Sequence, residues 1–238
     1  MWLVLCASDD LAALWAARSL AARGLSPVEV VTAEVLAYNR RFEHRLTDGR
    51  SSVKITLADG RVIDSATVRG TLNRLQIIPG SHLRTNTKDR DYAEQELFAL
   101  YLSWLYALPG KMLNRPTPQG LAGEWRHPSE WTWLATQAGL TTTPYSQSEF
   151  REAPVVCPPL SSPDSAVIVV DGVCCGAEAP AEIKAACARL SELSATRLLG
   201  VGFEVTRYGD WIFNGATPFP ELRFGGNRLV DLLFQSLS

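Results

Sequence analysis

The chain has 238 residues, of which 46% are hydrophobic and 20% are charged, a balance that predicts a folded protein and excludes a disordered or fibrous one. Lysine and arginine number 23 against 25 aspartates and glutamates, so the chain lacks the positive charge with which proteins bind nucleic acids. No stretch is apolar enough for a membrane-spanning helix, and the N-terminal residues predict a strand instead of a signal sequence. We therefore expect a cytoplasmic α/β protein of two lobes, without nucleic-acid or membrane partners.

The N-terminal residues predict the opening of an open sheet. Residues 2–7 form a β-rich run, and residues 11–23 follow capping residues such as Asp10 and predict a helix that ends at Gly24. Residues 28–32 read as a second strand. This order is typical of a β-α-β unit.

Between residues 43 and 138 the apolar residues recur first with the period of a strand and then with the period of a helix. Residues 43–63 alternate between apolar and polar and predict a β-hairpin, and residues 68–73 predict another strand. Helical spacing of apolar residues predicts helices over 91–108 and 129–138, the second of which should end at Gly139.

The C-terminal part predicts a second set of strands. A tight turn at Asp171–Gly172 joins two expected strands, and little periodic order precedes them in residues 146–165. The expected elements are strands 166–170 and 173–176, a helix 180–193, strands near 198–205 and 211–213, and a helix 227–236.

The cysteines and histidines form no recognisable redox or metal motif. Adjacent Cys174 and Cys175 lie in an expected strand, so their side chains should point to opposite faces. The histidines are too widely spaced for a zinc site. We expect reduced thiols that pack in the interior. The five cysteines are Cys6, Cys157, Cys174, Cys175 and Cys187, and the three histidines are His44, His82 and His127.

Three tryptophans, Trp125, Trp131 and Trp133, gather around the expected helix 129–138. Indole rings can hold a peptide, but they also bury a large apolar area. Trp131 and Trp133 fall on different faces of the helix. We expect at least two of the three rings to pack in the core.

Five short pieces of sequence follow one another in a recognisable order: Leu72-Asn73-Arg74, the helix with Glu94 and Glu96, Leu113-Asn114-Arg115-Pro116, Ala135 to Leu140, and Leu198 to Leu233. Taken in this order, they resemble the ATP-grasp ligases that modify ribosomal peptides and their relatives that join amino acids to carboxylates. Their order and spacing carry the resemblance, because each piece alone is unspecific. It implies an α/β fold with an open-sheet N-terminal lobe, residues 1–115, and a reduced ATP-grasp-like core, residues 116–238.

The chain departs from this family where a lid subdomain is expected. In the family, the lid follows the segment that corresponds to Ala135 to Leu140, and its sheet carries the lysines that hold the ATP phosphates. Here only the residues between Thr143 and Ala166 are available, and they contain no lysine and a single arginine, Arg151. Several strands of about five or six residues with their turns do not fit into that span. The resemblance therefore implies a shortened protein that lacks the lid.

The magnesium-binding positions of the family also differ. The resemblance places Gly202 at an acidic position and Ile212-Phe213-Asn214 at a Glu-x-Asn triplet, so only Asn214 keeps an oxygen ligand. Glu204 should face the same side of its strand as Gly202 and offers one substitute carboxylate. One amide and one displaced acid are poor ligands for magnesium, and a plain solvent-facing pair is the alternative interpretation. We expect no metal site and no cofactor.

Two asparagine–arginine pairs, Asn73-Arg74 and Asn114-Arg115, correspond to segments that face the cleft in the family. Guanidinium groups suit carboxylate or phosphate recognition, although arginines are common on any surface. We predict that the ligand-binding residues are Asn73, Arg74, Asn114, Arg115, Glu204 and Asn214, and we predict no catalytic residue.

Three hypotheses of function follow. The leading one is a noncatalytic binding or partner protein, a pseudo-ligase, that holds a peptide, an amino acid or a true ligase between its lobes in peptide modification or natural-product biosynthesis. The alternative is an ATP-dependent carboxylate-amine ligase that uses ATP and magnesium with a lid supplied by another subunit. The third is an unrelated α/β domain, which the absence of a second sheet after Ala166 would indicate. The sequence leaves the oligomeric state open.

Overall fold

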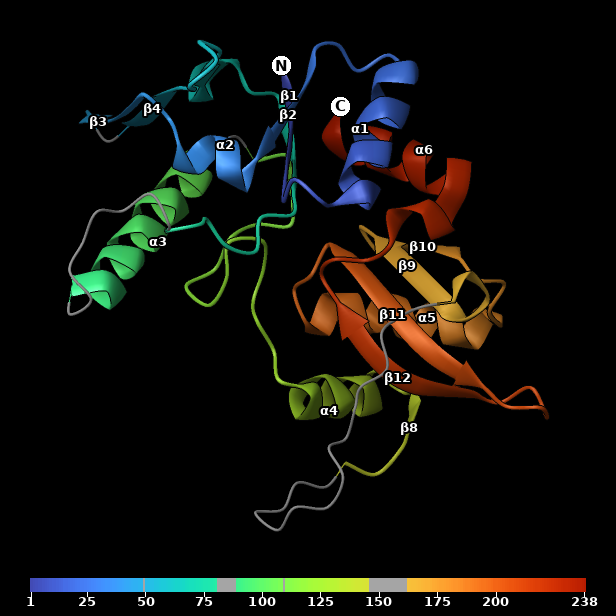
Figure 1. Ribbon diagram of the computed structural model, residues 1–238. Coiled ribbons are helices and arrows are strands. Elements are labelled where there is room, and N and C mark those ends of the chain that lie inside the picture. The colour runs from blue at the N-terminus through green and yellow to red at the C-terminus, as the bar shows by residue number, and fades with distance from the viewer. Residues whose placement is uncertain (49, 81–88, 109, 146–161) are drawn as a thin grey trace. The chain divides into compact units, whose positions relative to one another are not determined.

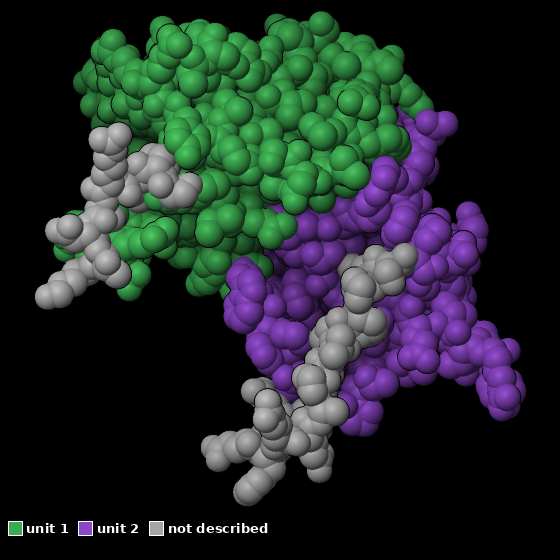
Figure 2. Space-filling view, viewed as in Figure 1, with its two compact units in different colours: residues 1–124, 234–238 green, residues 125–233 purple. Residues whose placement is uncertain are grey.

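The computed structural model forms two compact units, which Figure 2 shows in different colours. The division falls between Glu124 and Trp125, whereas the sequence alone places a boundary between residues 115 and 116. Unit 1 comprises Met1–Glu124 with Phe234–Ser238, and unit 2 comprises Trp125–Leu233. The structure describes residues 1–48, 50–80, 89–108, 110–145 and 162–238. His82, Arg151, Cys157 and most of the segment 146–165 lie outside the described residues.

Unit 1 is built on a four-stranded sheet (Figure 1). Its strands are β1 (Trp2–Cys6), β2 (Val28–Thr32), β6 (Gly70–Asn73) and β7 (Met112–Leu113). They lie in the order β2-β1-β6-β7, and all neighbouring pairs are parallel. The apolar run of β1 is buried almost completely, as expected for a parallel sheet that is covered on both faces.

Helices cover both faces of this sheet (Figure 1). Helix α1 lies on one face, and its first turn is capped by Asp10, whose side chain accepts a hydrogen bond from the backbone N–H of Ala13. On the other face, Tyr101 and Trp104 of α3 pack with Leu5 of the sheet in one apolar core. The helices are α1 (Leu11–Ala22), α2 (Ala33–Ala37) and α3 (Arg90–Ala107).

A second, antiparallel sheet in unit 1 packs against α3. Val53 and Ile55 alternate with exposed residues and are buried in the core that they share with α3. Its strands are β3 (Arg41–Thr47), β4 (Arg50–Thr56) and β5 (Val62–Asp64), followed by the short 3-10 helix η1 (Ser65–Thr67). The hairpin that the alternating period predicts is confirmed.

Unit 2 contains a five-stranded sheet in the order β10-β9-β11-β12-β8. Only the β12–β8 pair is parallel. The strands are β8 (Thr141–Thr142), β9 (Ala166–Val170), β10 (Val173–Gly176), β11 (Leu198–Val205) and β12 (Trp211–Thr217). This second sheet argues against an unrelated single-sheet domain.

Two helices of unit 2 cover one face of this sheet. Helix α4 (Pro128–Ala138) and helix α5 (Ala181–Leu193) share an apolar core with β9, β11 and β12, and α4 ends as expected at Gly139 in the left-handed conformation. The remaining elements are the 3-10 helices η3 (Pro163–Ser165) and η4 (Leu222–Gly225) and helix α6 (Gly226–Leu237). In the described ranges, no helix has both the length and the apolar character to cross a membrane.

The cysteines of the described ranges behave as expected. Cys174 Sγ contacts the backbone oxygen of Lys184 on α5, whereas the Cys175 side chain lies close to Gly225 of η4, so the two thiols point to opposite faces of the sheet. The four cysteines that the structure describes are free thiols.

Candidate functional site

The carboxyl ends of the parallel strands in unit 1 gather polar side chains at one edge of the sheet. Asp10 lies in the turn after β1, Glu34 follows β2, Arg74 follows β6 and Asn114 follows β7. Because open α/β sheets usually bind ligands at this edge, these four residues define the first candidate region. Asp10 and Glu34 are not among the ligand-binding residues that the sequence predicts. Their position directly after expected parallel strands is the signal that could have found them.

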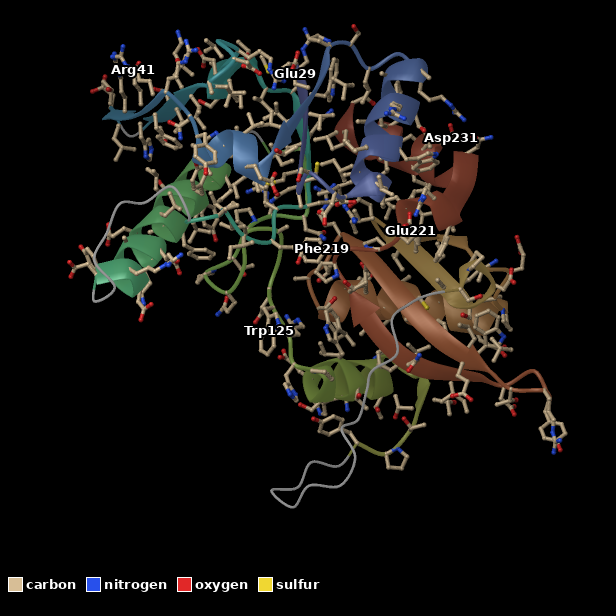
Figure 3. The ribbon with its side chains drawn as sticks, in the orientation of Figure 1. Glu29, Arg41, Trp125, Phe219, Glu221 and Asp231 are labelled. Carbon is tan, nitrogen blue, oxygen red and sulfur yellow. The ribbon has the colours of Figure 1, made fainter. Side chains whose placement is uncertain are left out.

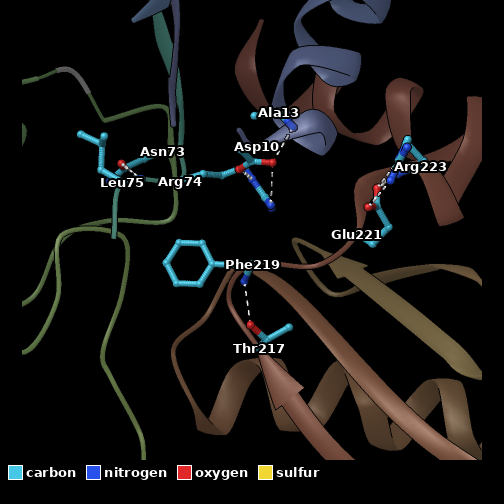
Figure 4. Close-up of polar contacts among 9 residues, drawn as sticks. All are labelled: Asp10, Ala13, Asn73, Arg74, Leu75, Thr217, Phe219, Glu221 and Arg223. Atoms are coloured by element: carbon cyan, nitrogen blue, oxygen red, sulfur yellow. Dashed lines mark hydrogen bonds and ion pairs between the residues drawn. The ribbon is translucent and has the colours of Figure 1, made fainter. Parts of the chain in front are cut away.

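Asn73 lies in the interior of unit 1, with none of its side-chain surface exposed. Its Nδ2 donates hydrogen bonds to the backbone oxygens of Asn114, at 3.0 Å, and Leu121, at 2.7 Å. Its Oδ1 accepts a hydrogen bond from the backbone N–H of Leu75 (Figure 4). The side chain therefore fixes the end of β6 to the segment that follows β7.

Arg74 forms a buried ion pair with Asp10 (Figure 4). The Nε to Oδ2 distance is 2.7 Å, and the two side chains are only 5% and 15% exposed. The other oxygen of Asp10 caps α1 through Ala13, so the pair ties the end of β6 to the start of that helix. Arg74 therefore binds a carboxylate of its own chain, that of Asp10.

Two titratable groups at this edge have shifted pKa values. Burial raises the pKa of the Cys6 thiol to about 11, and the nearby Asp10 carboxylate adds to the effect. Burial also raises the pKa of Glu34, but hydrogen bonds from its own backbone N–H, from Thr32 and from Ser8 outweigh burial and lower that pKa. At neutral pH the thiol is therefore protonated and unreactive, while Glu34 is ionised.

Asn114 and Arg115 differ in what they offer to a ligand. Asn114 is buried, and its backbone oxygen is bonded by Asn73. Arg115 is exposed and forms no ion pair with any residue in the described ranges. Its guanidinium is therefore the freely available positive charge among the predicted residues of unit 1.

The second candidate region is the face of the unit 2 sheet that lies opposite α4 and α5. Leu199, Val201 and Phe203 pack in the core with these helices, so the alternate residues Gly202 and Glu204 face the other side. The packing of their neighbours therefore supports the prediction that Gly202 and Glu204 lie on the same face of the sheet.

The strand pairing places Asn214 at a β-bulge. Gly202 pairs with Gly215, Phe203 pairs with Phe213, and Asn214 is the extra residue between these two pairs. Glu204 is exposed and pairs with Ile212. Glu204 and Asn214 therefore lie on neighbouring strands, but the residue directly opposite Glu204 is apolar.

Two glycines on these strands have different environments. A Cβ added at Gly200 would lie 2.8 Å from the Cβ of Pro220, so close packing requires glycine there. A Cβ added at Gly215 would meet no atom within 4 Å. Gly200 is therefore a close-packing position, whereas the backbone at Gly215 leaves room for a side chain.

The tryptophans correct one expectation from the sequence. Trp131 is buried at 6% exposure, but Trp125 and Trp133 are 69% and 61% exposed, so the prediction that at least two rings lie in the core is wrong. Trp125 (Figure 3) precedes α4 and packs edge-to-face with His127, and Trp133 lies on the outer face of the helix. Helical position, more than ring size, decides which ring is buried.

Comparison with solved structures identifies the class of fold. The macrocyclase MdnC from Microcystis aeruginosa, bound with the precursor peptide MdnA, superposes with a TM-score of 0.70 at 13% identity over 99% of this chain and 98% of that chain. A RiPP-associated ATP-grasp ligase from Chryseobacterium gregarium, in complex with ADP and a leader and core peptide, gives 0.68 at 11% identity over 99% and 96%. The ATP-grasp ligase PsnB complexed with a minimal precursor gives 0.62 at 16% identity over 100% and 99%.

The chain therefore has an ATP-grasp fold, and the predicted resemblance is confirmed at the level of the fold. No protein-family model matches the sequence, and no curated protein is similar to it in sequence.

The residues on the face of the unit 2 sheet that lies opposite α4 and α5 do not fit the magnesium–ATP site that the resemblance leads us to expect. Magnesium prefers carboxylate and other oxygen ligands in octahedral geometry. Glycine and isoleucine occupy two of the expected ligand positions, Gly202 and Ile212, and the open strand at Gly215 adds no side chain. In the part of the chain that the structure describes, no group of three or more acidic, histidine or cysteine side chains is placed to hold a metal ion.

Proposed function

We propose that the protein is a noncatalytic, ATP-grasp-like binding protein that holds a peptide or a partner protein in a peptide-modification pathway, in the cytoplasm. Similar folds in solved structures are bound with a precursor peptide or with a leader and core peptide, which supports a peptide as the partner. Fold likeness alone does not supply an activity, so the proposal depends on the residues of the two candidate regions.

The observation that carries the proposal is the pairing of β11 with β12. This pairing leaves Gly202 opposite Gly215 and Ile212 opposite Glu204, so a pair of facing carboxylates is missing where a phosphate-bound magnesium would need it. The segment between Thr143 and Ala166 also contains no lysine to neutralise charge that develops on transferring phosphates.

Arg115 is the residue that we assign to direct contact with a peptide carboxylate. It is exposed and has no ion-pair partner among the described residues, and a guanidinium can bind a carboxylate through two parallel hydrogen bonds. Among the other proposed ligand-binding residues, Asn73, Arg74 and Asn114 would hold the strand end that carries Arg115. Glu204 and Asn214 would offer polar contacts on unit 2.

A second candidate function is a carboxylate-amine ligase whose lid comes from another subunit. The observation that favours it is that Glu204 and Asn214 lie on neighbouring strands, where an oxygen pair remains. Such an enzyme would need both ATP and magnesium, and a lysine-bearing lid protein would have to complete it.

An assay for ADP release distinguishes the two functions. The protein would be incubated with ATP, magnesium and capped synthetic peptides that contain aspartate, glutamate and lysine. The binding-protein proposal predicts no ADP above the protein-free control. ADP that forms with the protein alone contradicts the proposal, and ADP that forms only after a lysine-rich lid protein is added establishes the second function.

A further inference from the structure

Unit 1 contains a cavity beside the first turns of α3, the green helix in Figure 1. Its volume is about 470 Å³, which lies within the range of sites that bind small molecules or side chains. Four of the lining residues are apolar and two carry carboxylates. The apolar residues are Ile77, Ile78, Phe98 and Leu121, and the acidic residues are Asp91 and Glu94.

The apolar part of the cavity combines buried and exposed surface. Ile78 and Leu121 are buried, and Phe98 is half-buried against the core. Ile77 is 72% exposed, so a large aliphatic side chain of the cavity wall meets solvent. Concave, mostly apolar walls with a few polar groups are typical of sites that bind a small molecule or a side chain.

The acidic part of the cavity has an excess of negative charge. Asp91 and Glu94 lie three residues apart on α3 and therefore on the same helix face. Arg90 pairs with Glu94, with 3.1 Å between Nε and Oε1, but both side chains are about half exposed and such a pair is weak. Asp91 has no ion-pair partner among the residues that the structure describes.

Gly80 allows the Glu94 side chain to lie close to the cavity. A Cβ at residue 80 would lie 3.0 Å from Glu94 Cγ and 3.2 Å from its Oε1. Glycine at this position therefore leaves room for the carboxylate beside the apolar wall.

We propose that this cavity binds a peptide segment in which an apolar side chain is followed by lysine or arginine. The apolar side chain would pack against Ile78, Phe98 and Leu121, and the cation would meet Asp91 and Glu94. A neutral or acidic segment would leave both carboxylates without a new partner, so charge decides which peptides bind. This binding goes beyond the proposed function, since it depends neither on nucleotide binding nor on Arg115.

The experiment uses two small peptide probes of nearly equal shape. N-acetyl-leucyl-lysine amide carries the positive charge, and its Nε-acetylated analogue lacks it. We expect the charged probe to shift the backbone amide resonances of Ile77, Ile78, Gly80 and residues 91–98 in the full-length protein, and to bind about tenfold more tightly than the neutral probe. Equal binding of the two probes, no binding of the charged probe, or shifts confined to other residues would overturn the proposal.

Variants on the same helix supply the control. The double variant Asp91→Asn/Glu94→Gln should weaken binding of the charged probe about tenfold, whereas Glu96→Gln, which removes an exposed charge that does not line the cavity, should leave it unchanged. All replaced side chains are exposed, so the variants should keep the wild-type spectrum outside the cavity. An equal loss of affinity in the Glu96→Gln variant would show that the probe is attracted by the net charge of the helix, and it would contradict binding in the cavity.

Discussion

The two candidate regions use polar residues in opposite ways. At the sheet edge of unit 1, Asn73 and Arg74 are buried and bind the chain's own carbonyl and carboxylate groups. On the face of the unit 2 sheet opposite α4 and α5, Gly202 and Gly215 pair and offer no side chain, and Glu204 is an exposed acid beside them. Asn73 and Arg74, which look like ligand contacts in the sequence, therefore stabilise the fold in unit 1. In unit 2, glycine and isoleucine stand at two positions where the sequence comparison leads us to expect acidic residues, Gly202 and Ile212.

The largest effect should come from breaking the buried ion pair. Arg74→Ala leaves the Asp10 carboxylate without its partner, and we expect a loss of about 3–5 kcal/mol in the free energy of unfolding, as for other buried pairs. Arg115→Ala, at an exposed position, should change stability by less than about 0.5 kcal/mol. Urea unfolding of both variants checks this, and equal stability of the two would show that Arg74 does not hold the fold.

A smaller loss should follow from Asn73→Ala. This change removes the donor that serves the buried carbonyls of Asn114 and Leu121, and we expect a cost of about 2 kcal/mol. The matched change Asn214→Ala at the bulge of unit 2 should cost little, because Asn214 is only partly buried. Thermal denaturation measures both. If Asn214→Ala proves the more damaging change, the contrast between the two regions is wrong.

The glycines of unit 2 allow a test within one region. Gly200→Ala should destabilise by about 1–2 kcal/mol, because its Cβ would lie 2.8 Å from that of Pro220. Gly215→Ala places its Cβ in open space and should be neutral. Urea midpoints of the two variants decide the point, and a similar loss at both positions would contradict an open surface at Gly215.

The smallest effect on stability should appear at acidic pH. Hydrogen bonds depress the folded-state pKa of Glu34 below the ordinary value of 4.5, so its contribution to stability is fully present above about pH 4.5 and is lost as the pH falls through the folded pKa. Glu34→Gln should therefore flatten the decline in stability below that pH, whereas Glu96→Gln should not. Melting temperatures from pH 3 to pH 7 measure it, and parallel wild-type and Glu34→Gln profiles would refute the assignment.

The sequence predicted local features better than distant contacts. The turn at Asp171–Gly172 and the cap at Gly139 are local signals, and the structure contains both. Strands β7 and β8 have two residues each, too few for a period to be detected, and they form only by pairing with distant strands. The partner of Arg74 is likewise remote, since Asp10 lies 64 positions earlier, and no spacing rule links the two.

The register of β11 and β12 is a second feature that the sequence alone does not predict. The residue types at Gly202 and Ile212 were visible in the sequence, as was the common side of Gly202 and Glu204. The bulge at Asn214 was not, because it depends on how two strands pair and not on either strand alone.

The most direct test of the account is a calorimetric titration of the protein with magnesium–ATP. The account predicts no saturable heat, because a phosphate-bound magnesium would meet glycine and isoleucine at positions 202 and 212 and no lysine from the segment between Thr143 and Ala166. A saturable heat with a dissociation constant near 1 µM, about −8 kcal/mol of binding free energy, would contradict the proposal of a noncatalytic protein.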